Sequence, residues 1–458
     1  MKAKHLEIPY FDAQTVLPGL SKEPGLIFLD SANHSHPLEN TNRYSYICYR
    51  PIDYLYLKNA VLDESPFASL QCKLKAFPQT PEESIPPFQG GAMGCFSYDL
   101  CHYFEKIPRV KHDKVNFPDM LVGIYDVVVS FDHRLKKSWI VSTGYPHYDQ
   151  KTRMKNAEYR LQQVYAEIVA AQSQTTLAPV VGKKMRSNFS KQAYEQAVSH
   201  ARQYILAGDI FEVNLSQQFH AKLDSPEEAM GLYLQLRQTN PAPFSAYLKF
   251  DEFVLASASP ERFLKVKNRQ VESRPIKGTI AVSKDWAENE KNKNALLNSE
   301  KDRAENTMIV DLMRNDFSRV CEPNSVVVEK LCGLETYEAV HHLVSVIRGT
   351  LQDNKDAIDL LAVSFPGGSI TGAPKIRAMQ IISELERRPR GPHYGSVGYI
   401  SFSGDMDTSI LIRSFAIEGT DVTLQAGGAI TLDSDPSLEY EESLLKAASC
   451  QKALECSL

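Results

Sequence analysis

The sequence contains neither a long apolar run nor a cluster of basic residues. Its first twenty residues, MKAKHLEIPYFDAQTVLPGL, have no apolar core of the kind found in signal peptides. No later run approaches the roughly 18 apolar residues that a membrane-spanning helix needs. Acidic residues outnumber basic ones, 56 to 51, and the formal charge is -5. We therefore expect a cytoplasmic protein without a membrane or nucleic-acid partner, since nucleic-acid binding requires a basic surface.

The eight cysteines lack the spacing of a metal site or a disulfide framework, because no CxxC motif and no Cys/His cluster is present. We expect ordinary reduced thiols. The chain of 458 residues is 43% hydrophobic and 23% charged, which is typical of a globular protein with a sizeable core. Disorder is excluded by the same composition.

One segment divides the chain. In residues 170–188 small and polar residues replace any periodic pattern, and no internal repeat is present. We therefore predict an N-terminal region at residues 1–175 and a second region at 188–455.

Helices and strands are both indicated by the hydrophobic patterns. Helices are predicted at residues 149–171, 190–208 and 435–454, with Ser190 and Asp435 as N-caps. Strand-like runs occupy residues 123–133, 394–402, 408–417 and 422–431, and the last three are predicted to form an antiparallel meander. This mixture predicts an α+β fold in which helices cover the outer faces of the sheets.

Acidic residues interrupt the apolar stripes of two predicted helices. Glu305 shares a helical face with Asp302 and Ile309, and Glu442 shares one with Glu439. A carboxylate near apolar surface must be paired, protonated or bound to a cation. Two such carboxylates from separate helices suit Mg²⁺, which prefers oxygen ligands and keeps bound waters. Ion pairs with Lys or Arg at a solvated edge remain the alternative.

Two further features favour chemistry. Glu261 and Lys277 lie near the ends of two short strands that we expect to pair; a desolvated lysine can become a nucleophile, and a buried glutamate can donate a proton. The alternative is a solvated surface lysine. Arg413 lies inside a predicted strand with Tyr399 across the hairpin, where a guanidinium suits a substrate carboxylate. A salt bridge at the sheet rim and core packing are the alternatives for these two.

A glycine-rich loop, SFPGGSITGAPKIRA, leads into a helix at residues 364–378. Backbone amides at such a junction attract anions, although a purely structural turn explains the loop equally well. The loop fails the Walker pattern because Ala373 stands where the lysine belongs, so nucleotide binding is disfavoured.

Taken together, these segments resemble the chorismate-utilising enzymes, which include anthranilate synthase component I, aminodeoxychorismate synthase component I, and the isochorismate and salicylate synthases. The motifs occur in the family's order after residue 188, and weaker similarity extends to FQGGAMGCFSYD and FPDMLVGIYD. The segments that carry the resemblance are ASPERF, RPIKGT, KDRAENTMIVDLMRND, VHHLVSVIRG, FPGGSITGAPKIRAM, GSVGYISF, MDTSILIR and EYEESLLK.

The resemblance implies a four-layer α/β/β/α sandwich of antiparallel sheets, like that of anthranilate synthase component I, in which the two regions interleave. It implies that Glu305 and Glu442 hold Mg²⁺ against the ring carboxylate of chorismate, with Asp302 and Glu439 behind them. Glu261 would be the general acid. The residues implied to bind the substrate are Gly278, Thr279, His342, Thr371, Tyr399, Arg413, Gly427 and Gly428.

Lys277 distinguishes the chemistries within the family. Anthranilate synthases resemble PIAGT at this loop, whereas PIKGT resembles the aminodeoxychorismate type. The resemblance implies that the Lys277 amine attacks C2 of the ring as the C4 hydroxyl leaves, and that ammonia then adds at C4 and expels the lysine. Glu212 replaces both the lysine of water-using members and the glutamine of ammonia-using members. Ala429 replaces a glycine, which would weaken binding if the site required positive φ.

Partners also follow from the resemblance. The chain has no Cys-His-Glu glutaminase segment, so ammonia is expected from a separate glutamine amidotransferase subunit in a heterodimer. The alternative functions are anthranilate synthase component I and a non-catalytic tryptophan-binding regulatory subunit. The sequence lacks the LLES pattern of feedback-regulated relatives, so a vacant or structural pocket is an equal alternative to a tryptophan site. The residues that resemble the tryptophan pocket are Ser31, Arg43, Tyr44, Pro243, Phe244 and Ser245.

Overall fold

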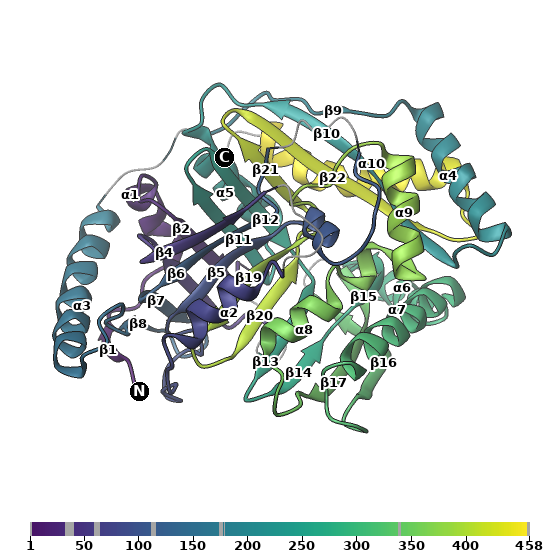
Figure 1. The fold of residues 1–458 in the computed structure, drawn as a ribbon. Coiled ribbons are helices and arrows are strands. Elements are labelled where there is room, and N and C mark those ends of the chain that lie inside the picture. Colours follow the sequence, from purple (N-terminus) through teal and green to yellow (C-terminus); the bar gives the residue numbers. More distant parts are fainter. Residues whose placement is uncertain are drawn as a thin grey trace.

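Two large antiparallel sheets form the centre of the protein (Figure 1). The computed structural model describes residues 2–32, 41–58, 65–110, 116–173, 177, 179–337 and 340–455. The first sheet contains, in spatial order, β1 (Lys4–Ile8), β8 (Lys137–Ser142), β7 (Val127–Asp132), β3 (Tyr44–Cys48), β2 (Leu26–Asp30), β11 (Phe244–Phe250), β12 (Phe253–Ser259), β21 (Ser414–Glu418), β22 (Asp421–Ile430), β10 (Glu212–Lys222) and β18 (Gly372–Ala373), with β9 (Arg186–Ser187) beside β10. The second contains β15 (Ile276–Ala281), β17 (Val340–Thr350), β14 (Gln270–Ser273), β13 (Arg262–Lys267), β20 (Met406–Ile410), β19 (Ser396–Ser401), β5 (Gly91–Phe96), β6 (Met120–Tyr125) and β4 (Asp53–Leu57), with β16 (Val327–Thr336) beside β17.

Helices cover the outer faces of both sheets. Contacts place α3, α5, α9 and α10 on the first sheet, and α2, α6 and α7 on the second. The helices are α1 (Leu17–Leu20), α2 (Ala68–Lys75), α3 (Gln150–Gln172), α4 (Lys191–Leu206), α5 (Glu228–Thr239), α6 (Trp286–Leu297), α7 (Glu300–Ser318), α8 (Ala357–Ser364), α9 (Lys375–Glu386) and α10 (Pro436–Glu455), and the 3-10 turns are η1 (Ala13–Val16), η2 (Tyr98–Tyr103) and η3 (Gly368–Ile370). The predicted α+β sandwich is therefore confirmed.

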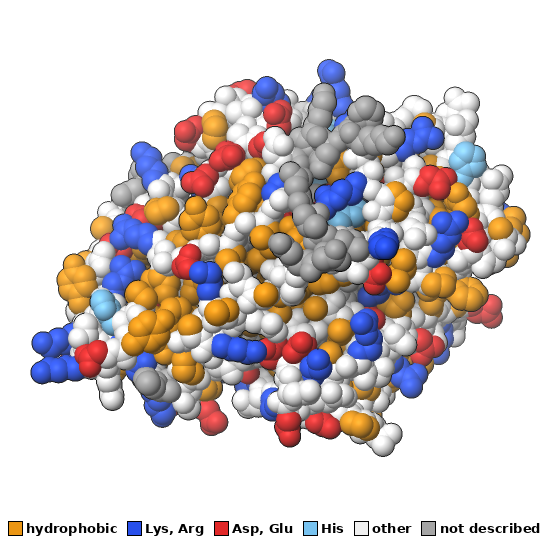
Figure 2. All heavy atoms as spheres, in the orientation of Figure 1, with side chains coloured by type: hydrophobic (Ala, Val, Ile, Leu, Met, Phe, Trp, Pro, Cys, Tyr) orange, Lys and Arg blue, Asp and Glu red, His pale blue; other side chains and the backbone are white. Residues whose placement is uncertain are grey.

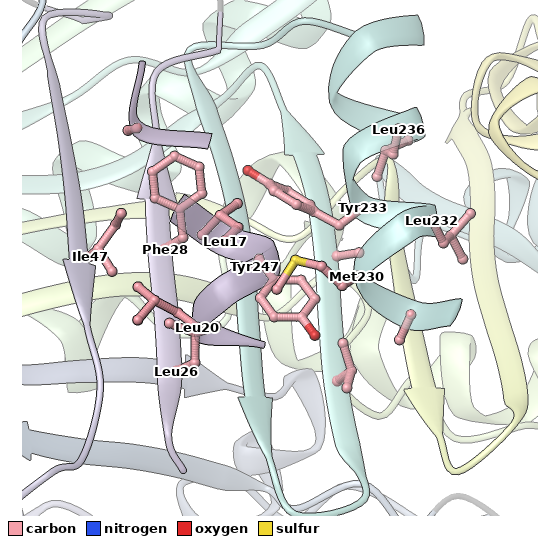
Figure 3. Packing of buried hydrophobic residues seen from close by; sticks show 14 of the residues in the cluster. Leu17, Leu20, Leu26, Phe28, Ile47, Met230, Leu232, Tyr233, Leu236 and Tyr247 are labelled. Carbon is pink, nitrogen blue, oxygen red and sulfur yellow. The ribbon is translucent and has the colours of Figure 1, made fainter. Parts of the chain in front are cut away.

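Separate apolar cores hold the layers together. Between the sheets, Ile27 and Leu248 from the first sheet pack in one cluster with Met93 and Leu121 from the second. Another core joins the first sheet to its helices, and Figure 3 shows side chains of α1 and α5 meeting those of β2, β3 and β11 there. Both faces of each sheet are thus covered, which accounts for strands such as β5 and β6 being buried along their whole length.

Both sheets combine strands from both sides of residues 170–188. In the first, Asp30 of β2 is the neighbour of Ser245 of β11; in the second, Gly94 of β5 is the neighbour of Gly398 of β19. Neither sheet is complete without strands from each region, although the proposed boundaries at 175 and 188 themselves stay a prediction.

The predicted meander is only partly confirmed: β19 pairs with β20 and β21 pairs with β22, both antiparallel, but the two pairs belong to different sheets. The run at residues 408–417 is not one strand, because β20 ends at Ile410 in the second sheet and β21 begins at Ser414 in the first. Arg413 therefore lies in the crossover between the sheets, not inside a strand, and it has a φ of 51°. The expected pairing near Glu261 and Lys277 is also wrong, since β13 pairs with β14 and β20, whereas β15 pairs with β17. The run of apolar residues Ile410, Leu411 and Ile412 continues across the change of sheet and conceals it.

The predicted helix starts are confirmed. The side chain of Ser190 accepts a hydrogen bond from the Ala193 amide, and Asp149 accepts one from Thr152. The Asp435 carboxylate accepts from Ser437 and Leu438 at the start of α10. Each cap satisfies amides that the first helical turn leaves without partners.

The surface has no basic tract on the face seen in Figure 2, where Lys and Arg are interspersed with Asp and Glu. In the described ranges no helix combines the length and apolar character required to cross a bilayer. The seven cysteines of these ranges are free thiols, six of them buried, as the sequence predicts.

Candidate active site

Lys277 lies between carboxylates from two other elements. Its Nζ atom is 3.2 Å from Glu212 Oε1 on β10 and 3.6 Å from Glu305 Oε2 on α7. The lysine side chain is 10% exposed and the two carboxylates are 2% and 9% exposed. Its position on β15 coincides with a register shift against β17, where Gly278 adopts a φ of 72°. This irregularity interrupts the regular strand pairing at Lys277 and changes the direction of its side chain, which lies beside Glu212 and Glu305.

The charges around Lys277 decide its protonation. Burial alone lowers the pKa of the ammonium, but the charges of Glu212 and Glu305 and the hydrogen bond to Glu212 outweigh burial and raise the pKa above its usual value. Burial also raises the pKa of Glu305 to about 7, against the opposing charge of Lys277. Lys277 is therefore an ammonium ion in the free protein. The sequence-based expectation that desolvation alone would neutralise it is wrong, because it omitted the two carboxylates.

Glu261 lies directly before β13 and is 6% exposed. Burial raises the pKa of its carboxyl to about 7, while a hydrogen bond with Ser369 and the charge of Lys277 act in the opposite direction. A carboxyl with this pKa is partly protonated at neutral pH. It can donate a proton, which fits the role of general acid.

A second group of carboxylates comes from α10. Glu442 forms an ion pair of 2.7 Å with Lys446, and Glu439 lies 3.3 Å from Lys301 Nζ. The Glu442 side chain is 45% exposed, so the predicted inward orientation is wrong for this residue and the alternative, an ion pair at a solvated edge, is what the structure shows. Gly428 approaches both acids so closely that a Cβ there would lie 3.0 Å from Glu439 Oε2 and 3.3 Å from Glu442 Oε1. Burial lowers the pKa of Lys301, but the negative charges of Glu439, Glu305 and Glu442 outweigh burial and raise this pKa above its usual value. The acids of α7 and α10 thus share one electrostatic environment.

The carboxylates fit an oxygen-liganded cation. Glu305 Oε1 and Glu439 Oε2 are both buried and have no hydrogen-bond partner. Among the described residues no three His, Cys, Asp or Glu side chains are grouped to enclose a metal. A cation held here would therefore keep several positions for water and substrate oxygens, which suits Mg²⁺.

Three of the predicted substrate residues meet beside Lys277. Thr279 Oγ1 on β15 is 2.8 Å from His342 Nδ1 on β17, the cross-strand neighbour. Burial, together with the nearby charge of Arg413, lowers the pKa of His342 to about 4, so the imidazole is neutral. Arg413 forms no ion pair or side-chain hydrogen bond within the described part of the chain, and burial lowers its pKa. An uncompensated guanidinium is an attractive site for a substrate anion.

The remaining backbone positions flank this group. Lys446, the partner of Glu442, donates a hydrogen bond of 3.0 Å to the Gly427 carbonyl. Thr371 is fully buried, and its carbonyl accepts from the amide of Asn214, two residues from Glu212. Ala429 pairs with Asn214 inside β22 and is not among the residues with positive φ. Its replacement of glycine therefore causes no backbone strain.

Tyr399 does not join this group. Its cross-strand neighbour on β20 is Asp407, not Arg413. The Tyr399 ring packs against Phe88 at 4.6 Å and Tyr46 at 5.5 Å between centroids, within the core between the sheets. It lines a cavity there, named the second cavity because it is separate from the group around Lys277. The predicted position across from Arg413 is wrong, because the strand is interrupted at residues 411–413, and the alternative of core packing is confirmed; the role of Tyr399 in substrate binding stays a prediction.

The second cavity contains all six residues predicted from the resemblance to a tryptophan pocket. Ser31 and Tyr44 come from the N-terminal part of the first sheet, and Pro243, Phe244 and Ser245 from the start of β11. Arg43 lines the cavity while its guanidinium pairs with Asp132 at 2.6 Å. Lys265 and Asp407 from the second sheet also line it, and no sequence pattern pointed to them.

Glu212 is the main residue of the site that sequence reasoning left without a role. The pattern that could have revealed it is the alternation of polar residues Glu212, Asn214 and Ser216 along one face of β10. Val213 and Leu215 alternate with them and belong to the apolar cluster beneath α4 and α9. The hydrogen bond of Ser369 with Glu261 and the Lys301 contact with Glu439 were likewise not foreseen.

Comparison with known proteins relates this geometry to a family. The chain is 40% identical over 448 residues to aminodeoxychorismate synthase component 1 of Escherichia coli, covering 95% of this chain and 94% of that protein. It is 35% identical to anthranilate synthase component 1 of Aquifex aeolicus, covering 94% and 89%. Similarity therefore extends over both regions of the chain.

Solved structures share the fold. Anthranilate synthase component I of Streptococcus pneumoniae superimposes with a TM-score of 0.77 at 32% identity, covering 92% of this chain and 94% of that one. The menaquinone-specific isochorismate synthase of Escherichia coli has the same fold, with a TM-score of 0.76 at 19% identity and coverage of 99% and 94%. The family model described as chorismate binding enzyme matches residues 27–452. The chain belongs to this family of chorismate-binding enzymes.

Proposed function

We propose that the protein is aminodeoxychorismate synthase component I, which converts chorismate and ammonia to 4-amino-4-deoxychorismate for para-aminobenzoate and folate synthesis. One observation carries this choice over anthranilate synthesis. Lys277, at the position where anthranilate synthases resemble PIAGT, is a buried ammonium paired with Glu212 at 3.2 Å and Glu305 at 3.6 Å. A lysine placed among the acids of the site is available to form a covalent intermediate.

Different residues of the site would bind the substrate, donate a proton and attack the ring. Arg413, neutral His342 and Thr279 would orient the carboxylates and ring of chorismate beside Lys277. Glu261, with its pKa raised to about 7 by burial, would protonate the departing C4 hydroxyl so that it leaves as water. The Lys277 ammonium must first release a proton to solvent, after which its amine attacks C2 and releases a second proton to give a neutral adduct. A covalent intermediate divides one difficult displacement into two steps.

Mg²⁺ is the proposed cofactor. Glu305 and Glu442 would hold it, with Asp302 and Glu439 behind them, and the buried oxygens of Glu305 and Glu439 that lack partners support this assignment. When bound, the ion would withdraw charge from the ring carboxylate and make the conjugated ring carbons electrophilic.

The decisive experiment is product identity. Purified protein with chorismate, Mg²⁺ and an ammonium salt should give 4-amino-4-deoxychorismate by mass spectrometry, and anthranilate as the product would reject the proposal. Lys277→Ala should abolish both the covalent adduct and amination. Lys267→Ala, at the exposed end of β13, is the matched control and should leave both unchanged.

We also propose a partner. The relatives carry the designation component 1, which supports assembly with a second component. Ammonia would come from a glutamine amidotransferase subunit, in the cytoplasm, where the free thiols of the chain would stay reduced. When such a subunit is added, glutamine should replace ammonium salt as the nitrogen donor for amination. Amination with glutamine when the subunit is absent would contradict the proposal.

A further inference from the structure

Glu212 carries an oxygen that the described protein leaves without a partner. Its Oε1 atom contacts Lys277 Nζ at 3.2 Å, whereas Oε2 is buried without any hydrogen bond. A buried carboxylate oxygen without a donor is costly, so its presence calls for a donor that arrives with a ligand. Asn214 Oδ1, on the same face of β10, is also buried and without a partner. Two acceptors without donors on one strand face suit a small ligand rich in N–H groups.

The position of Glu212 is suited to meeting such a ligand. It begins β10, where it is 2% exposed. The carboxylate lies directly against Lys277. The charged groups in this environment are Lys277 from β15, Glu305, Lys301 and Asp302 from α7, and Glu261 directly before β13. The adjoining β18 contributes only Gly372 and Ala373.

We propose that Glu212 binds an ammonium ion and shuttles a proton from it to the departing Lys277 nitrogen, an inference that rests on the proposed function. Ammonium cannot attack carbon because its lone pair is occupied by a proton. A carboxylate with one oxygen toward Lys277 and the other unpartnered can accept a proton on Oε2 and, after the carboxyl group rotates about its Cγ–Cδ bond, donate that same proton to the Lys277 nitrogen. A glutamine amide at this position is not basic enough to accept the ammonium proton, so it could not pass that proton to the Lys277 nitrogen.

The step balances as follows. An N–H bond of ammonium breaks and its proton passes to Glu212 Oε2, which leaves ammonia with a free lone pair. That pair forms the bond to C4, the ring double bond shifts, and the bond between C2 and the Lys277 nitrogen breaks. The departing nitrogen takes the bonding electrons and receives the proton from Glu212. The product carries its new nitrogen as an ammonium group, Lys277 is a neutral amine, and Glu212 is again a carboxylate.

The test isolates this half-reaction. The covalent adduct on Lys277 is first formed from chorismate and Mg²⁺ without ammonium, and its loss is then followed by quenched mass spectrometry after mixing with ammonium chloride. Glu212→Gln should still form the adduct. Near pH 7 the adduct of this variant should disappear at least about tenfold more slowly than the wild-type adduct. The rate for the variant should rise about tenfold per pH unit, because the concentration of free ammonia rises, whereas the rate for the wild type should vary little with pH.

Glu212→Asp keeps the carboxylate and shortens its reach. This variant should lose its adduct more slowly than the wild type but with the same weak dependence on pH. It replaces Glu212→Gln in the experiment if that variant fails to fold. Equal rates and equal pH dependence in wild type and Glu212→Gln, or an unchanged rate in Glu212→Asp, would overturn the shuttle. Loss of adduct formation in Glu212→Gln would also overturn it, by placing Glu212 in the first step. Absence of an adduct in the wild type would instead reject the proposed function itself.

Discussion

Arg413 and Arg262 are both largely enclosed by the protein, yet only Arg262 has counter-ions. Arg262 pairs with Asp407 at 2.9 Å and with Glu272 at 3.2 Å, whereas Arg413, at the crossover between the sheets, has no ionic partner in the described part of the chain. Desolvation of an unpaired guanidinium is unfavourable unless a ligand supplies the anion. Arg262 therefore has a structural role, whereas Arg413 is available to bind an anionic ligand.

Arg413→Met should therefore raise the free energy of unfolding, or leave it unchanged, while weakening chorismate binding by about 100-fold, equivalent to about 2.7 kcal/mol. Arg262→Met is the matched control. It leaves Asp407 and Glu272 without their cation and should destabilise the fold by about 3 kcal/mol. Urea unfolding and calorimetric titration with chorismate measure the two effects. Destabilisation of similar size in both variants would contradict a ligand-binding role for Arg413.

Glu261 should act in its protonated form. The catalysed rate is therefore expected to fall as pH rises through about 7, the value to which burial raises its pKa. Glu261→Gln should lower the rate by about 10²–10⁴-fold with little change in chorismate affinity. Glu252→Gln, in the exposed turn between β11 and β12, is the control. A rate that stays constant well above neutral pH would argue that another group is the acid.

The stability of the protein without metal should decline between about pH 5 and about pH 8. Burial raises the pKa of Glu261 and of Glu305 to about 7 in the folded chain, against a value of 4.5 for an unperturbed glutamate. The folded state thus binds more protons than the unfolded state across this window, so unfolding becomes easier as pH rises. Lys277 does not alter the sign, because its raised pKa lies above the window.

Glu305→Gln should remove part of this decline, with a difference on the order of 1–3 kcal/mol at the alkaline end. Thermal unfolding followed at a series of pH values with a chelator present measures it. Glu300→Gln, at the exposed start of α7, provides the comparison. A melting temperature that rises steadily over the same interval would contradict the assignment.

The hydrogen bond of Thr279 with His342 should support chorismate binding through the neutral imidazole. Thr279→Val is expected to raise the dissociation constant about 5- to 10-fold, as for the loss of one hydrogen bond. Thr307→Val removes a hydroxyl that bonds only the Arg303 carbonyl on the exposed face of α7, and should have no effect. Nitrogen NMR of His342 should show the neutral ring down to about pH 5, because its pKa is about 4.

The second cavity should bind tryptophan. Phe244 lines it, and the Arg262 guanidinium lies 5.0 Å from the centre of that ring. Calorimetry with L-tryptophan should show saturable binding, and Phe244→Ala should weaken it about tenfold through loss of ring contact. An absence of heat change at millimolar tryptophan would favour a purely structural pocket.

Local chemistry in the sequence was sufficient for some elements. Ser190, Asp149 and Asp435 were identified as helix starts because a short polar side chain before an amphipathic run satisfies free amides. Glu305 was recognised as inward-facing from its helical spacing with Ile309, and both residues are buried. These signals depend only on residues within a few turns of one another.

Features set by distant strands were not predictable. The chain changes sheets between Ile410 and Ser414 without any glycine or proline to mark the break. Tyr399 is therefore not opposite Arg413, and it packs in the core between the sheets, which was the alternative. The protonation of Lys277 depends on Glu212, which precedes it by 65 residues and reaches it only through the tertiary fold.

The pairing of β2 with β11 has a consequence for synthesis of the chain. The edge of β2 that receives β11 leaves the ribosome long before its partner does, and an unpaired edge is a template for association with other chains. Nascent molecules must therefore be protected until the later strands emerge, and the N-terminal half expressed by itself would be prone to aggregate.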